Sequence, residues 1–104
     1  MKIIKCISEK IEDELNMAEC YIKKAVEYKE DFPDVSKTFY GLSVGRLDTV
    51  KALHDQVVSL ITAYRKEHGE PPEGMSVLYN YMHERQIEKA MAVKNLQDLY
   101  NKNF

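Results

Sequence analysis

The sequence predicts an all-α protein of three long antiparallel helices in one domain, and three observations support this. The chain has 104 residues but only four glycines and three prolines, so few positions interrupt a helix. Apolar residues recur at steps of three and four through three long stretches, which is the period of an amphipathic helix. The two clusters of helix-breaking residues are short, and helices joined by short connections pack as antiparallel neighbours.

The first helix is expected over residues 2–30. Proline at position 33 disfavours helical backbone at Phe32, which places the first break there. Asp34 is a residue type that caps helix N-termini, and it is expected to open the next helix. The apolar positions that set the period are Ile4, Ile7, Ile11, Leu15, Ala18, Ile22, Ala25 and Tyr28.

The second helix is expected over residues 34–68 and the third over 73–101. Gly69 suits the position just past a helix end, and Pro72 is tolerated in the first turn of the third helix. Two adjacent apolar stripes run along the second helix, as expected for a middle helix that packs against both neighbours. The stripes contain Phe39, Leu42, Leu53 and Leu60, then Tyr40, Leu47, Val50, Val57, Ile61 and Tyr64.

Composition disfavours several functional classes. The net charge is -2 and lysines alternate with acidic residues, so the basic stripe of a nucleic-acid binder is missing. No apolar run approaches the roughly 20 residues that span a bilayer. Residues 1–6 lack the apolar core and cleavage site of a signal peptide, so we expect a cytoplasmic protein. Cys6 and Cys20 would lie about 21 Å apart on one helix, too far to pair.

Two segments, residues 11–19 and 34–54, resemble a known protein family. These segments resemble the first hairpin of ferritin-like and rubrerythrin-like proteins, which implies a ferritin-like up-down bundle. In that family a glutamate on the first helix and a Glu-x-x-His on the second hold half of a di-iron site. The pattern at residues 68–72 also looks like small uncharacterised proteins of Firmicute genomes and prophages, which implies a mobile-element context.

The ligands that the resemblance implies are largely replaced in this chain. Glu14 matches the first-helix glutamate, but Arg46 and Thr49 occupy the acid and histidine positions of the second helix. In an antiparallel hairpin, residues equally far from the turn lie at the same level. With a turn near residue 32, Glu14 lies within about one helical turn of the level of Arg46. A carboxylate facing a core requires a partner, and arginine can supply one. We therefore expect a structural Glu14–Arg46 ion pair and no metal, cofactor or catalytic residue.

His54 is the remaining candidate for metal chemistry. The same reasoning, applied to the second turn near residue 71, places Glu88 near the level of His54. Asp48 lies about a turn and a half from His54 on the second helix. Asp48, His54 and Glu88 could therefore form a weak metal site, or His54 and Glu88 could simply hydrogen-bond at a helix edge. His83 and Glu84 are adjacent and are expected to face different ways.

Three functions remain open from the sequence. The first is a non-enzymatic helical protein that acts through oligomerisation or partner binding, as a homodimer or larger even oligomer. The second is a di-metal carboxylate protein for iron oxidation or storage, with a site completed between subunits. The third is a small regulator or nucleic-acid accessory factor, which the even charge distribution disfavours. Three helices leave one side of a four-helix bundle open, and self-association would cover it.

Overall fold

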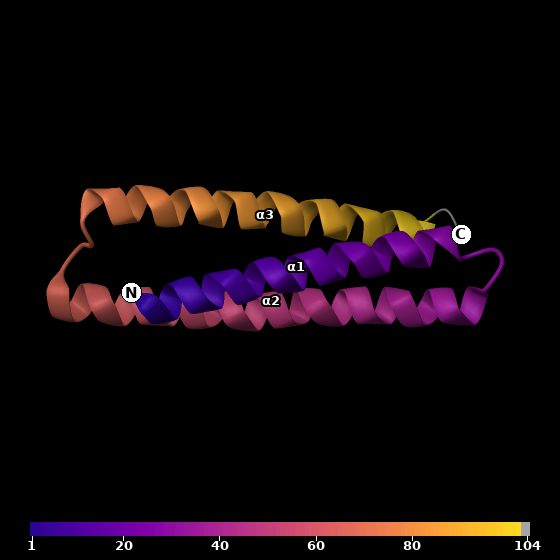
Figure 1. Cartoon of the computed structure of the whole chain (residues 1–104), viewed down its shortest axis with the longest axis horizontal. Helices are drawn as coiled ribbons and strands as arrows, with labels where there is room; N and C mark the ends of the chain where they lie inside the picture. Colours follow the sequence, from indigo (N-terminus) through magenta and orange to yellow (C-terminus); the bar gives the residue numbers. More distant parts are fainter. Residues whose placement is uncertain (103–104) are drawn as a thin grey trace.

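The computed structural model describes residues 1–102, which form an all-α bundle as predicted. Helix α1 spans Lys2–Glu27, α2 spans Pro33–His68 and α3 spans Glu73–Lys102. Consecutive helices run antiparallel, and the described residues include no strand (Figure 1). The bundle is elongated, with extents of 56 × 18 × 17 Å.

The helix ends differ from the prediction around the first turn. Helix α1 ends at Glu27, three residues early, and residues 28–31 form the turn. The expected Asp34 N-cap is wrong, because α2 begins one residue earlier at Pro33, with Phe32 as the N-cap. Proline fits this position because its fixed φ is helical and the first turn does not need its N–H. Gly69 follows α2 as predicted, with a φ of 75°.

Helix α1, and not α2, is the central helix of the bundle. It packs along α2 and also against α3, whereas α2 and α3 approach each other at few points (Figure 1). The expectation that the middle helix of the chain packs on both neighbours is therefore wrong. The difference shows in the side chains, because six apolar residues of α1 are buried while α2 contributes no buried apolar residue. The buried apolar set is Ile4, Ile11, Leu15, Ala18, Ile22, Ala25, Val93 and Tyr100.

Two buried serines of α2 hydrogen-bond to the backbone of α1. Ser36 and Ser43 lie one heptad apart on α2, and both are fully buried. The Ser36 hydroxyl donates to the carbonyl oxygen of Ala25 at 2.5 Å, and the Ser43 hydroxyl donates to that of Ala18 at 2.7 Å. Because the facing residues on both helices are small, the two backbones lie close enough for a serine hydroxyl of α2 to bond to a backbone carbonyl of α1.

Helix α3 is fixed to this seam by two further polar contacts. Gln97 Nε2 donates to Ser43 Oγ at 3.0 Å, and the Tyr100 hydroxyl lies 2.9 Å from Ser36 Oγ. The only proton of Ser36 is directed at the Ala25 carbonyl, so Tyr100 is the donor in the second contact. Every buried side-chain nitrogen and oxygen described by the structure has a partner. Specific hydrogen bonds therefore set the register of all three helices at this end of the bundle.

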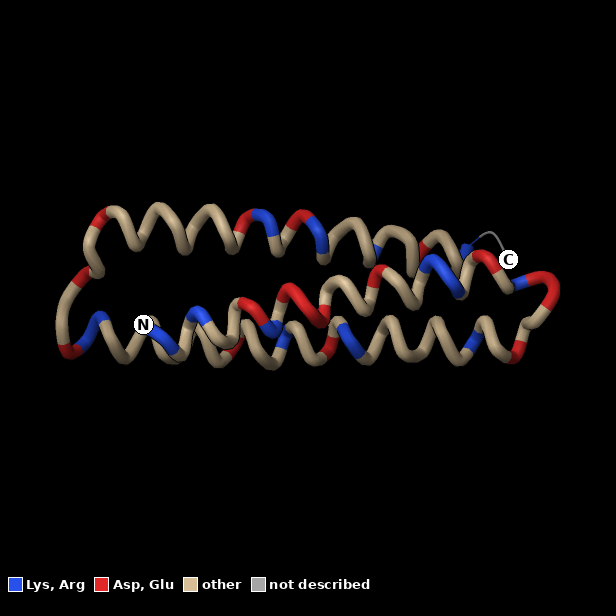
Figure 2. Tube along the Cα trace, in the orientation of Figure 1, with Lys and Arg blue, Asp and Glu red and all other residues tan. Residues whose placement is uncertain are grey.

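Charged residues of both signs occur on each helix (Figure 2). Between residues 1 and 102, no helix combines the length and apolar character needed to cross a membrane.

Candidate functional site: an open trough between α2 and α3

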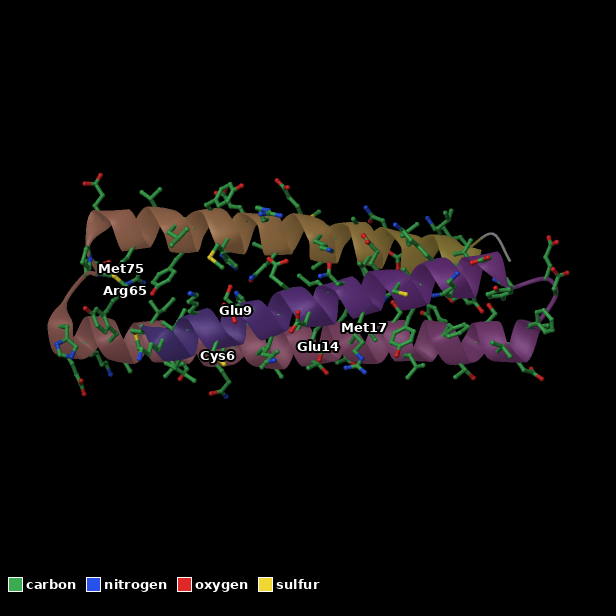
Figure 3. All side chains as sticks on the ribbon, viewed as in Figure 1. Cys6, Glu9, Glu14, Met17, Arg65 and Met75 are labelled. Carbon is green, nitrogen blue, oxygen red and sulfur yellow. The ribbon has the colours of Figure 1, made fainter. Side chains whose placement is uncertain are left out.

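Glu14 lies where α1 crosses α2 (Figure 3), and its carboxylate forms an ion pair with Arg46 of α2. Arg46 Nη1 lies 3.1 Å from Glu14 Oε1 and 3.0 Å from Oε2, so one nitrogen contacts both carboxylate oxygens. The side chains are 20% and 37% exposed, respectively, for Glu14 and Arg46. The hydrogen bond that Arg46 donates to the Glu14 carboxylate, and the negative charge of that carboxylate, raise the pKa of Arg46 above its ordinary value. A divalent metal at Glu14 would have to displace this cation.

Thr49 does not complete a ligand set at Glu14. Its side chain is exposed, and its hydroxyl donates to the Gly45 carbonyl of its own helix at 3.2 Å. No cluster of three or more histidine, cysteine, aspartate or glutamate residues suited to a metal occurs within residues 1–102. Asp48, His54 and Glu88, the weak candidates from the sequence, are thus not brought together as a three-ligand site.

His54 meets His83 instead of Glu88. The two Nε2 atoms are 2.8 Å apart, and the rings lie within 17° of parallel with centroids 4.8 Å apart. Glu88 lies beside Glu12, Arg85 and Lys89 on another side of α3. The sequence count misplaced the partner by more than one turn because it assumed that α2 and α3 pack directly. An uncertainty of two turns on either side of Glu88 would have included His83.

A continuous hollow lies between α2 and α3 on either side of this histidine pair. Its two parts have volumes of about 530 and 580 Å³, and they share Ile11, His54, His83 and Gln86. We refer to the whole hollow as the α2–α3 trough. Its apolar lining from α2 and α3 consists of Leu47, Val50, Val57, Val58, Ile61, Met75, Leu78, Met82, Ile87, Ala90 and Met91.

Apolar side chains project from the trough as well as line it. Val58 is 49% exposed, Leu78 53%, Ile87 44% and Met91 61%. On α2, one of the two stripes seen in the sequence supplies Leu47, Val50, Val57 and Ile61 to the lining. These four residues are only half-buried, so part of this stripe stays open to solvent in the monomer.

The charged groups that line the trough are mostly cationic. Lys2 and Lys5 come from α1, Lys51 from α2 and Lys94 from α3, whereas Glu9 is the one acid. This excess of positive charge contrasts with the net charge of -2 for the whole chain.

Met75 and Arg65 mark the far end of the trough, near the connection between α2 and α3 (Figure 3). A small hollow of about 80 Å³ continues there, lined also by Ile61, Tyr64 and Tyr79. The apolar surface thus extends from the middle of α2 to its C-terminal turns. Comparison of the chain with protein-family models, curated proteins and solved structures finds no match, so its function must be inferred from these side chains.

Proposed function

We propose that this chain is a non-enzymatic helical protein that acts by association through the α2–α3 trough, with a second copy of the chain as occupant. The observation that supports this is the apolar lining of a long hollow whose edges carry half-exposed valine, leucine, isoleucine and methionine. Contiguous apolar surface of this kind on soluble proteins usually belongs to an interface. A twofold dimer is the simplest product, and larger even oligomers can be built from it.

The dimensions of the trough suit a helix better than a small molecule. Its α2 wall runs from residue 47 to residue 61, about 21 Å at 1.5 Å per residue. A helix with its side chains is about 10 Å wide, and helices seat their apolar faces in such grooves. Small-molecule sites enclose most of their ligand. This trough is open to solvent, and the N-terminal half of α1 contributes the rest of its lining.

A second copy of the chain would cover the open side of the trough. Met91 and Val58 project from the two walls beside the hollow, so each copy offers both projections and a cavity. A twofold axis through the trough brings the projections of each copy onto the hollow of the other, because such an interface uses the same patch twice. The four lysines would face a like-charged partner, and added salt should therefore tighten the dimer by screening their repulsion.

The test is the molar mass in solution by light scattering at high micromolar concentration. The native chain is expected at twice its mass of 12.1 kDa or at a larger even multiple. Met91→Lys should shift the protein toward monomer, because it places another cation at the interface. Val77→Lys is the matched control: Val77 is 62% exposed, as Met91 is 61%, but it does not line the trough.

Two results would overturn the proposal. A native chain that remains a monomer at every concentration would exclude the second copy as occupant. An oligomer that Met91→Lys and Val77→Lys disrupt equally would exclude the trough as its interface. An oligomer that weakens with added salt would contradict the like-charged contact and would favour an acidic partner surface instead.

A further inference from the structure

The contact between His54 and His83 is unusual because two helices that barely touch each direct a ring nitrogen to the same point. His54 comes from the middle of α2 and His83 from the first half of α3, and their Nε2 atoms are 2.8 Å apart. Both residues line both parts of the trough. The pair therefore lies at the centre of the hollow and is reachable from the open side.

The hydrogen bond alone gives this arrangement little stability. Only one of two neutral rings can donate across the contact, and protonation of both rings removes the acceptor and leaves two like charges together. His83 is exposed and His54 half-buried, so water competes for the same nitrogens. The two converging Nε2 atoms are better suited to metal binding, since neutral imidazole nitrogens are strong ligands for transition metals.

We propose that His54 and His83 form a transition-metal site that binds Zn²⁺, Cu²⁺ or Ni²⁺ through both Nε2 atoms. These ions favour imidazole ligands. With metal–nitrogen bonds of about 2.0–2.1 Å, two tetrahedral ligands lie about 3.3–3.4 Å apart, so the two nitrogens must separate by about 0.5 Å. The near-parallel rings must also tilt until both lone pairs point at the ion. Water completes the coordination in an isolated chain. The site is distinct from Glu14, whose carboxylate is held by Arg46, about two turns from His54 along α2.

This inference does not require the dimer proposed above, because both ligands come from one chain. In a twofold dimer formed at the trough, two histidine pairs would lie near the axis and could share one ion. Saturation at one ion per chain, or at one per two chains, therefore agrees with the site. Binding should strengthen as the pH rises, because protons compete with the metal for the ring nitrogens.

The experiment is a calorimetric titration with Zn²⁺ in a Cys6→Ser/Cys20→Ser background. Both thiols are exposed and would otherwise bind the ion themselves. His54→Ala and His83→Ala are each expected to weaken binding by at least about tenfold, because even second-shell partners contribute about 10–100-fold. His68→Ala is the control, since His68 is an exposed histidine beside Glu67 at the end of α2. Circular dichroism of each variant checks that the helices are intact.

A spectroscopic measurement identifies the ligands directly. Cu²⁺ bound to the same background should show electron paramagnetic resonance couplings from two imidazole nitrogens, reduced to one in either alanine variant. Zn²⁺ affinity that is unchanged in both His54→Ala and His83→Ala would overturn the proposal. Loss of binding in His68→Ala to the same extent, or copper spectra without nitrogen couplings, would also overturn it.

Discussion

The buried contact between Ser43 and Gln97 allows a quantitative test of what holds α3 in register. Ser43 is fully buried and Gln97 is 2% exposed. Ser43→Ala removes the acceptor of Gln97 Nε2 and the donor to the Ala18 carbonyl. That carbonyl lies inside α1 and still accepts its helical hydrogen bond. The amide of Gln97 is therefore the group left without a partner.

Leaving a buried amide unsatisfied costs about 1–3 kcal/mol of unfolding free energy. Alanine is the better helix former by up to about 0.5 kcal/mol, which offsets a small part of this cost. Ser59→Ala measures that offset alone, because Ser59 is an exposed serine in the same helix. The difference between the two serine variants should thus be about 1–3 kcal/mol. For a domain of this size this corresponds to a melting temperature lower by about 4–8 °C per kcal/mol.

Urea unfolding followed by circular dichroism at fixed protein concentration supplies the free energies. Gln97→Met removes the stranded amide at similar volume, so Ser43→Ala/Gln97→Met should recover most of the stability lost in Ser43→Ala. The coupling energy of this double-mutant cycle isolates the pair. If the double variant is no more stable than Ser43→Ala, or if Ser59→Ala is equally destabilised, the hydrogen bond does not fix α3 as we argue.

Two further predictions concern the hairpin and the end of α2. Arg46→Ala should lower the urea midpoint more than Glu14→Gln/Arg46→Met does, because only the single variant leaves a half-buried carboxylate without its cation; equal midpoints would contradict the pairing. Gly69→Ala should cost about 1–3 kcal/mol, since a φ of 75° with a ψ of -162° is a backbone conformation that residues with a Cβ rarely adopt. Gly74→Ala, at a helical glycine with open space around it, is the control and should not destabilise the chain.

The helices could be predicted from the sequence because their signals are local. Apolar period and breaker residues determine where α1, α2 and α3 lie to within a few residues. The approximate level of Glu14 and Arg46 also follows, since α1 and α2 are joined by a short turn and pack directly. The count placed Arg46 within a turn of Glu14, and the structure joins the two side chains.

The arrangement of α3 could not be predicted in this way. Whether it packs on α1 or on α2 depends on the volumes of side chains from all three helices, and a periodic stripe does not contain that information. Ser36 and Ser43 lie outside the expected apolar core, yet they are the residues of α2 that are buried. Their spacing of one heptad, opposite Ala25 and Ala18, was an available signal. His83 was missed for the same reason, because its position depends on how α3 lies over α1.

The trough extends along α3 from Met75 to Lys94, whereas most of the buried residues of this helix lie at its C-terminal end, and this offset bears on how a partner could enter. Val93, Gln97 and Tyr100 are buried in the second half of α3, whereas Gln86 is the only residue buried in its first half. Regions with few buried contacts open at low free-energy cost. The first half of α3 is therefore expected to open more readily than the second half, which the serine seam keeps in register, and such opening would give the second copy or the metal ion proposed above room to enter.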